Sequence, residues 1–308
     1  MTPARFINFF EPESSLISNQ FLPHVVVLAS LISPAIVFEQ SALLAHDASP
    51  SSSGVSTLNE CTTVHDSILR FIGETDWQKL KQTLPEERRE LVTKLVDCAE
   101  TRIRESRPLR LTFICTHNSR RSQLAQVWAQ TAAAYFGLTR EDVLCFSGGT
   151  EATACNRRTV EALRRSGFVV TETSLSPDVV GETDNVGDPA NVREPDSVGE
   201  PGSVGEIAKD NVPYEVSFGE QHPAIECFSK VYNQSHNPNT QYVAVMCCDH
   251  ADQNCPVVFG ATDRIAMWYV DPKAFDGTDR ESAAYDERNL QVAREMWSAM
   301  GELAQRLQ

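Results

Sequence analysis

The chain has 308 residues and carries 27 basic against 42 acidic side chains, a formal net charge of −15. Its length suffices for one large or two ordinary domains with a real core. The acidic excess argues against nucleic acid and anionic membrane as main partners. Nine cysteines, an odd number without the spacing of a secreted disulfide framework, favour a reducing compartment, so we expect a cytoplasmic protein.

Residues 1–60 do not have the pattern of a catalytic region. The uncharged span 14–38 is interrupted by Pro23 and Pro34, and the segment before it is not basic, unlike that of a signal peptide. A serine-rich run at residues 48–54 is typical of a flexible linker. We therefore interpret residues 1–60 as a disordered extension, with a targeting or membrane segment as the alternative.

Residues 61–108 have a helical pattern. The sequence Leu84-Pro85-Glu86-Glu87 is typical of a helix start, where proline and acidic residues are both favoured. The apolar residues that follow at helical spacing are Leu91, Val92, Leu95, Val96, Ala99 and Ile103. We expect this face to pack against the domain that follows, although periodicity alone would fit a partner surface equally well.

An apolar run at residues 109–115 stops at Cys115, where a helical pattern begins. The helical spacing is carried by Leu124, Val127, Trp128 and Thr131. Cys115 is therefore expected at a strand-to-helix turn, where unpaired backbone N–H groups and the helix dipole create an anion site. Such a site shifts a cysteine towards its thiolate, and the guanidinium of Arg121 could hold an oxyanion that the thiolate attacks. A buried structural thiol beside a solvated arginine is the alternative.

Strands and helices alternate along the rest of the chain. We expect strands at residues 142–146, 241–246 and 265–270, a helix at 156–166 and a long helix from about residue 280. This order predicts an α/β domain over residues 109–308, preceded by the helical segment, with a small parallel sheet and flanking helices. Its ligand would lie at the carboxyl ends of the strands.

An acidic repeat interrupts this domain. Valines at positions 180, 186, 192, 198 and 204 recur every sixth residue, mostly followed by glycine and an acid. Hexapeptide repeats can build a parallel β-helix, but one apolar residue in six is too few to offset the entropy of ordering. We interpret residues 174–212 as a disordered acidic loop.

Two further motifs follow predicted strands. Cys248 and Cys255-Pro256 flank a short acidic segment, and their spacing of two helical turns would place both thiols on one side of a helix. A zinc site that includes His250 and inert core thiols are the alternatives, although the usual zinc-ligand spacings are absent. Asp271-Pro272 could be a plain turn, or its carboxyl group could protonate a leaving oxygen.

In combination, these motifs resemble the low-molecular-weight protein tyrosine phosphatase superfamily, which includes the thioredoxin-coupled arsenate reductases. The motifs are Cys115 with Arg121-Ser122, Ser147-Gly-Gly-Thr150, the Cys248 to Cys255-Pro256 segment and Asp271-Pro272. The resemblance implies a flavodoxin-like fold, Cys115 as nucleophile, Arg121 as oxyanion clamp and Asp271 as general acid. The oxyanion loop would be completed by His117, Asn118, Ser119, Arg120 and Ser122. In the common form of this loop a glycine stands at the place of His117 and often a cysteine at that of Arg120.

The resemblance makes arsenate reduction our first hypothesis. Cys248 would attack the arsenylated Cys115 and release arsenite, and Cys255 would pass the disulfide to thioredoxin, the implied partner and reductant. Cys247 is the alternative to Cys248. No bound cofactor or metal is expected. A phosphatase acting on phosphate monoesters through a phosphocysteine would need neither Cys248 nor Cys255, and a catalytically idle oxyanion-binding scaffold is a third hypothesis.

Overall fold

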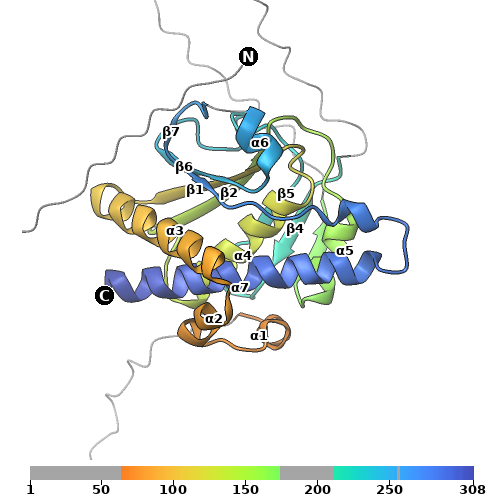
Figure 1. Cartoon of the computed structure of the whole chain (residues 1–308), viewed down its shortest axis with the longest axis horizontal. Coiled ribbons are helices and arrows are strands. Elements are labelled where there is room, and N and C mark those ends of the chain that lie inside the picture. The colour runs from red at the N-terminus through yellow and green to blue at the C-terminus, as the bar shows by residue number, and fades with distance from the viewer. Residues whose placement is uncertain (1–63, 174–210, 255–256) are drawn as a thin grey trace, which may run out of the picture. The chain divides into compact units, whose positions relative to one another are not determined.

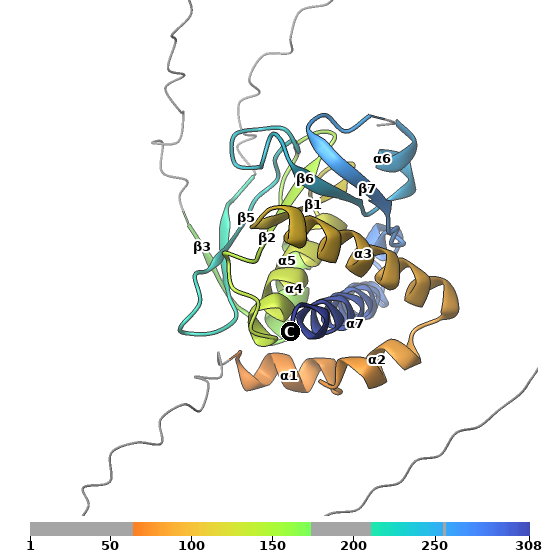
Figure 2. The same cartoon turned by 90° about the vertical axis from the view of Figure 1, so that its left-hand side faces the viewer.

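The computed structural model describes residues 64–173, 211–254 and 257–308 (Figures 1 and 2). The expectations for residues 1–60, for nearly all of the acidic repeat and for Cys255 lie outside these ranges. Within them, no helix is long and apolar enough to cross a lipid bilayer.

A parallel sheet of four strands forms the centre of the described domain. In spatial order the strands are β2 (Val143–Gly149), β1 (Leu109–Cys115), β6 (Tyr242–Met246) and β7 (Ala261–Ala266). Every residue of β6 is buried, as expected for a central strand covered on both faces, whereas the edge strand β7 carries the charged residues Asp263 and Arg264. The expected α/β class is therefore confirmed. The chain reverses its direction of travel across the sheet between β1 and β6, and ligands bind at such a switch point.

Helices cover one face of the sheet in successive layers. The helices α3 (Glu86–Glu105) and α4 (Arg121–Tyr135) lie against the strands, and α7 (Glu281–Leu307) packs on both of them (Figure 2). The outer layer is formed by α1 (Asp66–Ile72) and α2 (Trp77–Thr83), which pack on α7. Because α4 is enclosed between the sheet and α7, all but its two end residues are buried.

The helical segment before the sheet packs on the domain through the face identified in the sequence. In α3 the buried residues are Val92, Leu95, Val96, Ala99 and Ile103, while Leu91 is half-buried. The helix begins directly after Pro85, and both Glu86 and Glu87 lie in its first turn. Its contacts with α7, β1 and β7 make it part of the same core.

One strand expectation needs correction. The last strand of the parallel sheet is Ala261–Ala266 rather than residues 265–270, because the chain turns away from the sheet edge after Ala266 and exposes Trp268 and Val270. In addition, a second sheet that the sequence did not indicate is formed by β3 (Val169–Glu172), β4 (Tyr214–Ser217) and β5 (Ile225–Cys227). Its strands pair antiparallel and are only three or four residues long, too short for their burial pattern to stand out in the sequence.

The remaining elements lie near the carboxyl ends of the strands or against α7. They are α5 (Arg157–Arg165), α6 (Asp249–Asn254) and a 3₁₀ helix at Pro272–Phe275. Asn156 caps α5 by accepting the Arg158 N–H, and Asp271 caps the 3₁₀ helix by accepting the Lys273 N–H. The long C-terminal helix begins one residue after the expected Arg280, and its buried face includes Tyr285, Ala293, Trp297 and Met300.

A glycine inside α7 sets how closely α2 approaches. A Cβ atom on Gly301 would lie 2.6 Å from the Cβ atom of Trp77. We expect Gly301→Ala to lower the free energy of unfolding by up to about 2 kcal/mol, because crowding costs roughly 1–3 kcal/mol and the gain in helix propensity offsets about 1 kcal/mol of it. Urea denaturation of the full chain measures this difference.

A double-mutant cycle provides the control for this expectation. In a Trp77→Ala background the crowding is gone, so Gly301→Ala should stabilise the chain by up to about 1 kcal/mol. A destabilisation of equal size in both backgrounds would contradict the proposed contact.

Candidate active site

The loop between β1 and α4 bonds its carbonyl groups to the surrounding protein. Five consecutive carbonyls, from Cys115 to Ser119, each accept a hydrogen bond of 2.7–3.1 Å. In the same order, the donors are Thr150 N, Glu151 N, Ser229 Oγ, Gln123 Nε2 and Asn156 N. The loop is thus fixed from outside by the turn after β2, by α4, by the approach to α5 and by the segment after β5.

The N–H groups of the same loop are left without partners. Among the described residues, no acceptor bonds the backbone N–H groups of residues 116–120, although four of these five residues are buried. Unpaired buried N–H groups are costly, and a run of them beside a helix N-terminus is suited to an anion. The loop backbone therefore presents a row of unpaired donors of the kind that the predicted anion site requires.

Cys115 lies at the start of this loop, and its sulfur has a polar neighbour. The residue is 3% exposed, and its Sγ atom lies 3.1 Å from the Oγ atom of Ser122. Ser122 is held in turn by the Asn118 side chain, whose Nδ2 donates at 2.9 Å. A hydroxyl group so fixed can stabilise negative charge on the sulfur.

Asn118 adopts the left-handed conformation that closes the loop, with φ of 45°. Its Oδ1 atom accepts the backbone N–H of Lys230 at 3.1 Å. Neighbouring His117 lies 2.9 Å, through Nδ1, from Glu151 Oε1, and Ser119 donates to the Ala154 carbonyl at 2.6 Å. The Ser119 side chain therefore bonds outside the loop and leaves an oxyanion only its backbone N–H group, whereas the half-exposed imidazole of His117 lies beside Glu151 without a hydrogen bond in the described residues.

Gly149 allows the end of β2 to lie against the loop. A Cβ atom there would come within 2.8 Å of Asn118 N and 2.7 Å of Thr116 O. Any other residue would displace the loop backbone, which gives a physical reason for the glycines in Ser147-Gly-Gly-Thr150.

Arg120, Arg121 and Asp271 form a partly buried charge cluster. Arg120 donates to both carboxylate oxygens of Asp271 at 2.8 and 3.4 Å, and Arg121 Nη2 lies 3.1 Å from Oδ2. Burial acts to raise the pKa of Asp271, but the guanidinium groups of Arg121 and Arg120 outweigh it and lower that pKa below its ordinary value. Arg121 also donates to the Tyr269 carbonyl at 3.2 Å, and its buried Nε atom has no hydrogen-bond partner in the described residues.

The helical segment before the sheet supports the chain that carries Asp271. Arg88 of α3 forms a buried ion pair with Glu295 of α7 and donates to the Trp268 carbonyl at 3.0 Å. Its guanidinium also lies 4.9 Å from the centre of the Tyr269 ring. Residues 268 and 269 are thereby fixed just before Asp271, a connection that the sequence did not indicate.

Two cysteines follow β6 at the switch point of the sheet. Burial, and then the thiols of Cys115 and Cys248, raise the pKa of the Cys247 thiol well above its ordinary value. The Sγ atom of Cys248 lies 3.5 Å from Thr116 Oγ1 and accepts the Ala251 N–H at 3.4 Å. Both residues thus lie near the loop, whereas Cys255 is outside the described residues. Among those residues, no group of three His, Cys, Asp or Glu side chains gathers closely enough to hold a metal ion.

Residues 228–232 also hold the loop, and the sequence did not indicate them. Lys230 accepts the Gly149 N–H at 2.8 Å, and Ser229 Oγ bonds both the His117 carbonyl and the Thr153 N–H. Buried Asn211 fixes this segment by accepting from Ser229 N and donating to Ser229 O. No spacing in the sequence marks these residues, since their partners His117, Gly149 and Thr153 are more than seventy positions away.

Comparisons with known proteins find similarity in solved structures only. No family model and no curated protein matches the chain. The chain is similar to a mutant of YwlE from Bacillus subtilis at 15% identity, covering 65% of this chain and 98% of that one with a TM-score of 0.35. It is also similar to a thioredoxin-dependent arsenate reductase of Corynebacterium glutamicum at 16% identity, covering 79% and 88% with a TM-score of 0.31.

Two substitutions at Asn118 separate the contribution of its backbone conformation to stability from that of its side-chain hydrogen bonds. Both Asn118→Gly and Asn118→Ala lose the bonds to Ser122 and Lys230, but only alanine is strained at this φ. We expect the alanine variant to be less stable than the glycine variant by about 1 kcal/mol, measured by urea denaturation. Equal stabilities would show that the loop does not enforce the left-handed conformation.

The charge cluster makes stability depend on pH. Because the pKa of Asp271 is lower in the folded chain than in the unfolded chain, its ionised form stabilises the fold above about pH 3.9, and this contribution is lost as the pH falls through the folded value. We expect Asp271→Asn to lower the free energy of unfolding by on the order of 1 kcal/mol at pH 7 and to have a smaller effect near pH 3. Denaturation curves from pH 7 to 3 measure the difference.

Asp279, an exposed aspartate outside the cluster, provides the control for this pH dependence. Asp279→Asn should show no such trend. A deficit in Asp271→Asn that stays constant or grows towards pH 3 would contradict the assignment.

Proposed function

We propose that this chain is an arsenate reductase whose nucleophile is Cys115. The observation that carries the proposal is the loop backbone, with its carbonyls bonded outward and the N–H groups of residues 116–120 unpaired beside a cysteine. A tetrahedral oxyanion offers acceptors to several such donors at once. The nearby Cys248 favours reduction over simple ester hydrolysis, because reduction of arsenate needs a second thiol that forms a disulfide with Cys115.

The first step forms a bond between sulfur and arsenic. The Cys115 thiolate attacks arsenate held by the loop N–H groups and Arg121, and one arsenate oxygen leaves as water after protonation. Asp271 is suited to supply the proton once the oxyanion is bound. A doubly charged anion at Arg121 weakens that residue's pairing with Asp271 and adds negative charge beside it, and both effects raise the pKa of the carboxyl group.

The second step transfers two electrons to arsenic. The Cys248 thiolate attacks the Cys115 sulfur, so the disulfide forms while the sulfur–arsenic pair stays on arsenic, which leaves as arsenite. The Ala251 N–H at the Cys248 sulfur favours negative charge there, whereas the raised pKa of Cys247 keeps that residue a neutral thiol. These contacts support Cys248 as the attacking residue.

The third step returns Cys115 to its thiolate. Cys255 would attack Cys248 and release Cys115, and a dithiol of the thioredoxin kind would reduce the resulting Cys248 to Cys255 disulfide. The role of Cys255 rests on its position in the sequence, seven residues after Cys248 and before a proline.

A phosphatase is the second candidate, because Cys115, Arg121 and Asp271 would suffice to form and hydrolyse a phosphocysteine. Two assays separate the candidates. The first follows arsenate-dependent NADPH oxidation with thioredoxin and thioredoxin reductase, and the second follows hydrolysis of para-nitrophenyl phosphate. We expect Cys115→Ser to abolish any turnover in both, by at least about three orders of magnitude.

The other cysteines provide matched variants. Cys248→Ser and Cys255→Ser should abolish arsenate turnover and leave any phosphate hydrolysis intact, while Cys247→Ser and the distant Cys98→Ser should retain both. Undiminished arsenate turnover in Cys255→Ser would rule out the three-cysteine relay. Phosphate hydrolysis without arsenate turnover in the unaltered chain would establish the phosphatase instead.

A further inference from the structure

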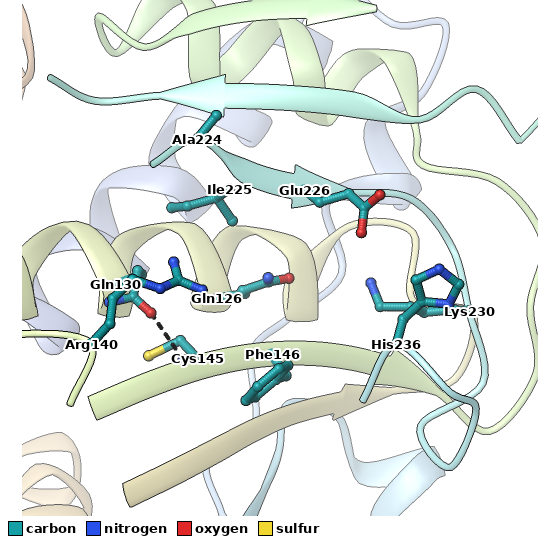
Figure 3. Close-up of a pocket in the computed structure, with 10 residues that line it drawn as sticks. All are labelled: Gln126, Gln130, Arg140, Cys145, Phe146, Ala224, Ile225, Glu226, Lys230 and His236. Carbon is teal, nitrogen blue, oxygen red and sulfur yellow. Dashed lines mark hydrogen bonds between the residues drawn. The ribbon is translucent and has the colours of Figure 1, made fainter. Parts of the chain in front are cut away.

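A polar cavity lies behind the loop between β1 and α4, which we call the catalytic loop, and Cys115 does not line it. It has a volume of about 160 Å³ and lies between α4, β2 and β5 (Figure 3). Its polar lining includes Gln126, Arg140, Glu226, Lys230 and His236. Neither the nucleophile nor the Arg121 cluster contributes to it, so the function proposed above does not account for its chemistry.

Lys230 places a buried ammonium group in this cavity. The residue is 4% exposed, and the recorded hydrogen bond of its Nζ atom is a long one, 3.4 Å to the Phe228 carbonyl. The Phe228 ring centre lies 4.2 Å away, and no carboxylate oxygen of the described residues lies within 4.0 Å of Nζ. A buried cation with so few partners is costly unless an anion accompanies it.

Gln126 provides a second unsatisfied group. It lies on α4 between Gln123 and Gln130, whose side chains are both hydrogen-bonded. Gln123 donates to the Phe228 carbonyl at 2.8 Å, and Gln130 accepts the Cys145 N–H at 3.0 Å. Gln126 is 6% exposed, and its Oε1 atom has no hydrogen-bond partner in the described residues. Figure 3 shows its amide and the Lys230 side chain extending into the same space. An amide can present its NH₂ group by a simple flip, so both residues can donate there.

The charges of the lining select the kind of ligand. Arg140, an exposed residue, adds a second positive charge, and Glu226, which is also exposed, is the single acid among the lining residues. Burial lowers the pKa of Lys230, and a bound anion would oppose that effect. The cavity therefore favours a small ligand with negative charge and several acceptor oxygens.

We propose that this cavity is a second anion site, which binds a small oxyanion, tetrahedral or carboxylate, through Lys230 and Gln126. The site is joined to the catalytic loop by the backbone of Lys230, whose N–H donates to Asn118 and whose carbonyl accepts from Gly149. An anion that fixes the Lys230 side chain thus also steadies the residue that closes the loop around Cys115. The proposal does not depend on the reaction at Cys115.

Titration of the full chain with sulfate, followed by amide NMR at constant ionic strength, tests the site. Sulfate is suitable because thiols do not reduce it. A parallel titration with acetate shows whether the cavity binds a carboxylate as well as a tetrahedral anion. We expect the Gln126 side-chain amide and the Lys230 backbone amide to shift and reach a plateau with one or both anions. The same shifts should persist in Arg121→Ala, which removes the principal cation of the catalytic loop.

Lys230→Met should weaken this binding at least about ten-fold, because it removes a charged donor. Lys79→Met removes the same charge from an exposed lysine of α2 and should leave the binding unchanged. If Lys230→Met does not fold, Gln126→Glu places a repelling carboxylate in the cavity and should abolish the Lys230 shift. Shifts without a plateau, shifts lost in Arg121→Ala, or unchanged binding in Lys230→Met or Gln126→Glu would overturn the proposal.

Discussion

The bonding of the loop carbonyls to the surrounding protein is the constraint on which the site depends. The carbonyls of Cys115 to Ser119 accept hydrogen bonds from outside the loop, so the loop forms neither a helix nor a strand. The N–H groups of residues 116–120 therefore remain available to a ligand. The loop holds this conformation because Asn118 accepts a left-handed φ and Gly149 leaves room for the backbone. The chemistry proposed for Cys115 depends on this loop conformation.

Two segments outside the parallel sheet, far apart in the sequence, both support the site. Helix α3 reaches the chain before Asp271 through Arg88, and the segment after β5 reaches Asn118 and Gly149 through Lys230. Both carry buried charges, one paired with Glu295 and the other without a carboxylate within 4.0 Å in the described residues. This difference marks the first as a structural support, whereas the second is the basis of the proposed second anion site.

Elements set by local sequence patterns could be predicted, whereas those set by long-range contacts could not. The run to Cys115, the helical spacing after it and the start of α3 at Glu86 are local signals, and the structure has these elements at or within one residue of the expected positions. The short strands β4 and β5 and the supporting residues Arg88 and Ser229 gave no signal, because their partners lie far away in the sequence. The end of β7 was misjudged because an apolar run continues past the point where the chain leaves the sheet.

The sequence by itself determined the α/β class, the place of Cys115 between a strand and a helix, and the candidate residues around it, because periodicity and turn chemistry act over a few residues. Only the tertiary structure decided that Arg120 and Arg121 pair with Asp271, that the Ser119 side chain bonds outside the loop, and that Lys230 is buried behind it. Such facts depend on which distant groups a side chain meets, and burial and neighbouring charge then set its chemistry.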